Sequence, residues 1–169
     1  ELKPGLIESW DVTPDGLSVT FKLRHGVKWH NKPPVNGREF EARDVVYSLR
    51  SITGVHYPEL PVVRFPRKST IEAFKDAVAV DKYTVKVTLS KPSPGFLSGL
   101  TDYRNHAIPD GLREAFGADL QGPQPGDAAR KIGTGAFVYT KYEESVEEYY
   151  ERNPEYWDMG ADGKSKPYL

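Results

Sequence analysis

Alternation of apolar and polar residues between Leu17 and Trp29 constrains the fold more than any other feature of this sequence. The apolar residues of one parity are Leu17, Val19, Phe21, Leu23, Val27 and Trp29. A period of two predicts a β-strand that buries one face. The pairs Asp15-Gly16 and His25-Gly26 predict tight turns at its two ends. We therefore expect a central strand over residues 18–24, with Val19, Phe21 and Leu23 in the core.

The residues after this strand predict elements that can cover its apolar face. Residues 40–52 carry apolar side chains at helical spacing and place Asp44 and Ser48 on the opposite, polar side. Alternation on both sides of residues 81–83 predicts an antiparallel hairpin over residues 74–89. A capping-box pattern over residues 69–72 leaves a short helix open as the competing interpretation.

The second half of the sequence predicts shorter elements. Ser93 before Pro94 is typical of a helix start, and a second short helix is expected over residues 110–116. Alternation around residues 143–145 predicts another hairpin. With 14 Pro and 15 Gly, the chain is unlike a helical bundle. The predicted fold class is α+β, with a small mixed, mainly antiparallel sheet and flanking helices.

Composition argues against several classes of partner. The net charge is −1, with basic and acidic residues interspersed, so we expect no binding of nucleic acid or of an anionic membrane. The absence of cysteine excludes disulfides and thiolate chemistry. No apolar run approaches the roughly 20 residues that span a bilayer, and the first residues are unlike a signal peptide. We therefore expect no targeting signal in this chain.

Catalytic and metal-binding patterns are weak in this sequence. Nucleophile-elbow, zincin, phosphate-loop and dinucleotide fingerprints are missing, so we expect no enzyme activity, no catalytic residue and no cofactor. Of the four histidines, His25 and His30 are the closest pair and are expected on opposite strand faces, as surface or turn residues, so no metal site is expected. Glutamates over residues 143–148 suggest a glycan hydrolase as an alternative, but such chemistry needs facing carboxylates. Clustered tyrosines over residues 139–157 are expected in packing more than in stacking against sugars or bases.

Short motifs follow one another along nearly the whole chain. They are Leu6-Ile7-Glu8-Ser9-Trp10, Thr20-Phe21-Lys22-Leu23-Arg24, Gly26-Val27-Lys28-Trp29-His30, Ala42-Arg43-Asp44-Val45-Val46, Asp81-Lys82-Tyr83-Thr84-Val85, Gly133-Thr134-Gly135-Ala136-Phe137, Arg152-Asn153-Pro154-Glu155-Tyr156-Trp157 and Lys166-Pro167-Tyr168-Leu169. In order and spacing they resemble the family 5 extracellular solute-binding proteins. Members of that family are the oligopeptide-, dipeptide- and nickel-binding receptors of ABC importers.

The resemblance implies a fragment of a peptide receptor. Family members are longer, so residues 1–116 are expected to form the smaller α+β subdomain, residues 117–135 a linker, and residues 136–169 a hairpin and exit segment that returns to the first lobe. The implied protein is extracellular or periplasmic, is membrane-anchored in its full length, and delivers a peptide or similar solute to an ABC permease. Two lobes of such a receptor close around the solute by a hinge motion.

Three further expectations follow from comparing the chain with the family pattern. Tyr57, in the irregular loop over residues 54–66, is the candidate ligand-binding residue, because the equivalent region of relatives can approach the cleft. Glu41 replaces a better helix cap, so the first turn of the helix at residue 42 is expected to fray. A homodimer through the last hairpin is expected if its usual partner surface is missing. The alternative function is a stand-alone interaction module that uses exposed aromatic residues.

Overall fold

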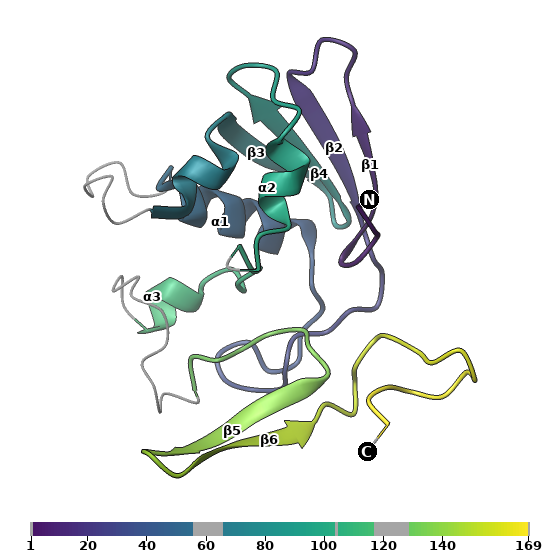
Figure 1. Cartoon of the computed structure of the whole chain (residues 1–169), viewed down its shortest axis with the longest axis vertical. Coiled ribbons are helices and arrows are strands. Elements are labelled where there is room, and N and C mark those ends of the chain that lie inside the picture. The colour runs from purple at the N-terminus through teal and green to yellow at the C-terminus, as the bar shows by residue number, and fades with distance from the viewer. Residues whose placement is uncertain (1, 56–65, 104, 117–128, 169) are drawn as a thin grey trace. The chain divides into compact units, whose positions relative to one another are not determined.

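A computed structural model describes residues 2–55, 66–103, 105–116 and 129–168 of the chain (Figure 1). The chain divides into two compact units. Unit 1 contains residues 1–25 and 41–107, and unit 2 contains residues 26–40 and 108–169. Strands and short helices occur together, so the predicted α+β class with mainly antiparallel strands is confirmed.

Unit 1 is built on a four-stranded sheet with the order β1-β2-β4-β3. Its strands are β1 (Ile7–Val12), β2 (Ser18–Leu23), β3 (Phe74–Asp81) and β4 (Thr84–Leu89). Each neighbouring pair is antiparallel. The hairpin predicted over residues 74–89 is therefore confirmed. β2 lies between β1 and β4, which confirms that the alternating stretch forms a central strand.

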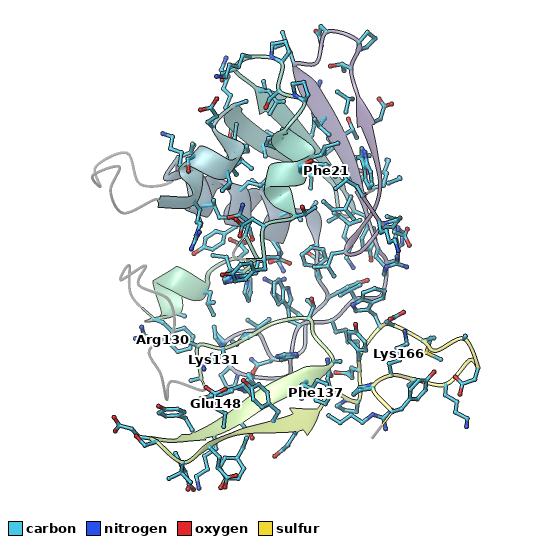
Figure 2. All side chains as sticks on the ribbon, viewed as in Figure 1. Phe21, Arg130, Lys131, Phe137, Glu148 and Lys166 are labelled. Carbon is cyan, nitrogen blue, oxygen red and sulfur yellow. The ribbon has the colours of Figure 1, made fainter. Side chains whose placement is uncertain are left out.

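The side chains of β2 alternate as the sequence predicted. Val19, Phe21 and Leu23 are buried, and Phe21 is 1% exposed. Figure 2 shows Phe21 inside unit 1, between the sheet and the helices. Lys22 points away from the core, and its ammonium donates a hydrogen bond to Thr84 Oγ1 at 2.8 Å. Leu17 departs from the pattern because it precedes the strand and is 38% exposed.

Helix α1 (Ala42–Thr53) packs against the sheet of unit 1 (Figure 1). Its first turn is held by a capping box, which corrects the expectation of fraying: the Glu41 amide donates to Asp44 Oδ2 at 2.9 Å. Asp44 and Ser48 are buried, although the sequence placed them on the polar side. The reason is local, because the Asp44 carboxylate serves the helix start and Ser48 Oγ donates to the Asp44 carbonyl at 2.6 Å.

The described part of unit 1 also contains two short helices, the 3-10 helix η2 (Pro66–Ile71) and the α-helix α2 (Phe96–Leu100). The capping-box pattern at residues 69–72 therefore does not open an α-helix, since the 3-10 turn ends there. Ser93 is not the N-cap either: the N-cap of α2 is Gly95, two residues later, and the Ser93 carbonyl accepts a hydrogen bond from the Phe96 amide at 3.1 Å.

Unit 2 combines loop 26–40, helix α3 (Leu112–Phe116) and a hairpin of β5 (Phe137–Glu143) and β6 (Glu147–Arg152). The predicted helix over residues 110–116 and the predicted last hairpin are confirmed. Tyr139 pairs with Tyr150 across the hairpin, and a register shift follows between Tyr139 and Lys141. Val27, Trp29, Val35 and Phe40 of the loop are buried. Trp29 and Phe40 meet edge to face, with ring centroids 5.6 Å apart.

The compact units and the predicted domains divide the chain at different places. Loop 26–40 packs within unit 2, whereas the prediction grouped it with residues 1–116. Residues 117–128 of the predicted linker lie outside the described residues. As a division of a longer receptor, the segments 1–116, 117–135 and 136–169 stay a prediction.

Candidate functional site

The most closely connected polar site among the described residues is in unit 2, around His30. Tyr57, the ligand-binding candidate from the sequence, lies outside the described residues. His30 was expected at the surface or in a turn, and this expectation is wrong: the residue is 5% exposed. The partners that bury it come from residues more than one hundred positions away, which a local pattern cannot indicate.

Both ring nitrogens of His30 contact the Gly133–Gly135 backbone. The Gly133 amide lies 3.2 Å from Nδ1, and the Gly135 carbonyl lies 3.0 Å from Nε2. An amide can only donate and a carbonyl can only accept. The geometry therefore assigns the neutral ring with its proton on Nε2. The backbone adds a further bond, because the His30 amide donates to the Gly133 carbonyl at 2.8 Å.

Asn153 joins a third segment to the same carbonyl. Its Nδ2 donates to the Gly135 carbonyl at 2.9 Å, and its own amide donates to the Ala136 carbonyl at 2.8 Å. The Asn153 Oδ1 accepts from the Glu155 amide at 3.0 Å, which turns the chain after β6. Lys28 and Glu155 form an ion pair beside this turn. We call His30, Gly133, Gly135 and Asn153 the His30 joint.

Burial controls the charge state of the joint. Desolvation lowers the pKa of His30 below its ordinary value, the Gly135 carbonyl acts in the opposite direction, and the charge of Lys32 lowers it further. The pKa of Lys32 is itself lowered, first by burial and then by Lys131. Neutral imidazole is therefore the form that this environment favours.

A cationic cluster lies beside β5. The Lys32 ammonium donates to the Tyr139 carbonyl, and Lys131 Nζ lies 3.7 Å from the centroid of the Tyr139 ring. Lys131 also pairs with Glu148 at 4.0 Å, and Figure 2 labels both side chains at the hairpin. The Tyr139 hydroxyl is buried and has no hydrogen-bond partner among the residues that the structure describes. These contacts hold the edge of β5 against loop 26–40.

The glutamates of the last hairpin do not form a hydrolase site in the described part of the chain. Glu143 and Glu147 lie directly across the hairpin near its turn, but Glu143 pairs with Lys141, and Glu147 accepts from the Tyr149 hydroxyl. The bond from Lys141 is the main cause that lowers the pKa of Glu143. A general acid of glycoside hydrolysis needs a raised pKa, and Glu143 has the opposite shift.

Aromatic side chains of the hairpin divide between packing and exposure. Tyr139 is buried against the ring of Tyr150, with centroids 5.2 Å apart, which agrees with the expected packing role. Phe137, Val146 and Tyr150 remain exposed. Within the described ranges, no group of three or more acidic or histidine side chains could hold a metal ion, and no helix is long and apolar enough to cross a membrane.

Comparison with known sequences gives matches along the whole chain. The family described as bacterial extracellular solute-binding proteins, family 5 middle, matches residues 1–169. Di/tripeptide-binding protein 2 of Pseudomonas aeruginosa is 34% identical over 98% of this chain and 31% of its own length. Heme-binding protein A of Haemophilus influenzae is 30% identical over 93% of this chain and 29% of its own length.

A solved structure agrees with these matches. The periplasmic binding protein DppA of Helicobacter pylori, in complex with the peptide STSA, superposes with a TM-score of 0.73 and 27% identity. The match covers 94% of this chain and 32% of that one. The chain therefore spans about one third of the length of the relatives it matches. These relatives are binding proteins by name, and none is named as an enzyme.

Proposed function

Since this chain belongs to the family 5 bacterial extracellular solute-binding proteins, we propose that it is part of the receptor of an ABC importer for peptides. The observation that carries the proposal is the match over residues 1–169, together with relatives named for di- and tripeptides. The receptor binds its solute without changing it and passes it to an ABC permease. It works outside the cytoplasm, in the periplasm or extracellularly, and is held at the membrane in its full length.

Peptide is the favoured solute class, and haem is the alternative that the relatives themselves supply. Calorimetric titration distinguishes the two solute classes. The complete protein, expressed from the reading frame that contains this chain, is titrated in parallel with dipeptides, tripeptides and haem. Saturable binding of peptides at micromolar or lower concentration supports the proposal. Binding of haem without peptide binding overturns the solute class, and binding of neither overturns the receptor function.

Tyr57 is proposed as a ligand-contacting residue of that complete receptor. The support is its position in the sequence, in a stretch that contains Pro and Gly and joins α1 to η2. Replacing Tyr57 by Ala is expected to weaken peptide binding at least about tenfold if its ring packs on the solute. Tyr103→Ala is the matched control, because Tyr103 is an exposed tyrosine of the same unit. Equal affinity of the Tyr57 variant and the control removes Tyr57 from the site.

We also propose that the last hairpin mediates self-association of the isolated chain. Exposed Phe137, Val146 and Tyr150 on that hairpin are the support. Sedimentation of the chain at increasing concentration is expected to show a dimer. Tyr150→Lys should then return it to a monomer, and a monomer at all concentrations contradicts the proposal.

A further inference from the structure

We propose that His30 is a pH-sensitive latch, which ties loop 26–40 to residues 133–135 while its ring is neutral and releases them when its ring is protonated. The inference concerns the fold and does not depend on the identity of the solute. Both ring nitrogens are already committed: Nδ1 accepts from the Gly133 amide at 3.2 Å, and Nε2 donates to the Gly135 carbonyl at 3.0 Å.

Protonation removes one of these two bonds by necessity. The proton adds to Nδ1, which then becomes a donor and faces the Gly133 amide, another donor. The amide is a fixed backbone group and cannot exchange its role with a neighbouring acceptor. Leaving the amide without a partner is unfavourable while the site stays buried. Separation of the ring from Gly133, with entry of water, avoids this cost and opens the latch.

The charged side chain that acts on the His30 ring is a cation, Lys32. The charged side chains within three positions of His30, Gly133 or Asn153 are Lys28, Lys32, Arg130, Lys131, Glu151, Arg152 and Glu155. Cations predominate among them, and the charge of Lys32 acts directly on the imidazole. Glu155 pairs with Lys28. A protonated His30 would therefore be a buried cation beside another cation, which opposes the closed joint.

The direction of the pH effect follows from proton linkage. The pKa of folded His30 lies below the ordinary value of 6.5, so the unfolded chain takes up this proton first as the pH falls. The contribution of the joint to stability is therefore complete above pH 6.5. It decreases as the pH falls from 6.5 toward the pKa of the folded state, and the latch opens as the pH passes through that lower value.

Hydrogen exchange of the Gly133 amide, followed by NMR, tests the latch in the chain itself. As the pH is lowered from about 7.5 through the titration of the His30 ring, its protection factor, corrected for the intrinsic exchange rate, should fall about tenfold or more. The midpoint should coincide with titration of the His30 ring proton on Cε1. Unchanged protection over this range, or a midpoint that differs from the ring titration, overturns the proposal.

Two variants make the test specific. His30→Gln keeps one donor and one acceptor but does not titrate, so its Gly133 amide should stay protected at low pH. His106→Gln removes an exposed histidine of unit 1 and should behave like the unmodified chain. If His30→Gln shows the same loss of protection as the unmodified chain, another group causes the pH effect and the proposal is wrong. Should His30→Gln fail to fold, the agreement of the two midpoints in the unmodified chain decides.

Discussion

In unit 1, two apolar residues at alternating positions of the same stretch differ in how far they are buried. Phe21 is buried in the middle of β2, while Leu17 of the same parity lies before the strand and is partly exposed. The alternating pattern predicts on which face of the strand a side chain lies. Whether that side chain is buried also depends on where the hydrogen-bonded strand begins and ends. Stability should therefore depend strongly on one of these residues and weakly on the other.

Phe21→Ala is expected to lower the free energy of unfolding by about 3 to 5 kcal/mol, because it leaves a cavity beneath the central strand. Leu17→Ala is the matched control and should cost under about 1 kcal/mol. Urea unfolding followed by circular dichroism measures both values. Equal losses for the two variants would contradict the assignment of the core.

Tyr139 offers a second test at the residue scale. Its ring packs in unit 2, but its buried hydroxyl finds no hydrogen-bond partner in the described part of the chain. Tyr139→Phe keeps the ring and removes the hydroxyl, so the free energy of unfolding should stay the same or rise by up to about 1 kcal/mol. Tyr150→Phe is the control, since it loses the bond from its hydroxyl to Glu148 at 2.6 Å and should gain nothing. A loss of more than about 1 kcal/mol in Tyr139→Phe would mean that the hydroxyl is bonded.

At the scale of elements, the packing of α2 on η2 depends on one glycine. A Cβ added at Gly99 would lie 1.9 Å from the Thr70 carbonyl oxygen, which belongs to the backbone and cannot rotate away. Asn105 fixes the same contact, because its Nδ2 donates to Thr70 Oγ1 at 2.7 Å and to the Gly99 carbonyl at 2.8 Å. The side chain of Asn105 thus links the two short helices where they lie closest to each other at Gly99.

Gly99→Ala is expected to destabilise unit 1 by about 1 to 3 kcal/mol through this overlap. Gly95→Ala provides the comparison, because a Cβ there meets nothing within 4 Å and the residue has no positive φ. Thermal unfolding of the two variants should give a lowered midpoint for the first and a nearly unchanged midpoint for the second. Equal midpoints would show that η2 and α2 can separate at little cost.

Elements were predictable from the sequence where the signal is local. Alternation predicted β2 and both hairpins, and helical spacing predicted α1. The His30 joint was not predictable, because His30, Gly133 and Asn153 are far apart in sequence and each is ordinary in its own surroundings. The burial of Asp44 was missed because its partner is the backbone at the helix start, which the apolar period does not register. Local sequence patterns predict helices and strands, whereas the His30 joint depends on hydrogen bonds between residues that are far apart in the sequence.

For the whole molecule, the resemblance to a known family indicated more about function than the composition or the search for catalytic motifs did. The quoted motifs include both His30 and Gly133-Thr134-Gly135, which the structure brings together within unit 2. In this chain the two motifs are joined by the hydrogen bonds of the His30 joint. This chain covers about one third of the length of the relatives that it matches.

The last prediction concerns affinity. The chain alone is expected to bind peptides at least about a hundredfold more weakly than the protein encoded by the complete reading frame. A receptor that encloses its ligand buries most of the ligand surface and leaves few polar groups unpaired. A smaller surface gives up apolar burial and hydrogen bonds while the loss of translational freedom stays the same. Calorimetric titration of one dipeptide and one tripeptide into both proteins, side by side, measures the difference. The unfolding transition of the chain, recorded in the same buffer, establishes that the tested protein is folded. Comparable affinities would refute the prediction and would locate the binding site within residues 1–169.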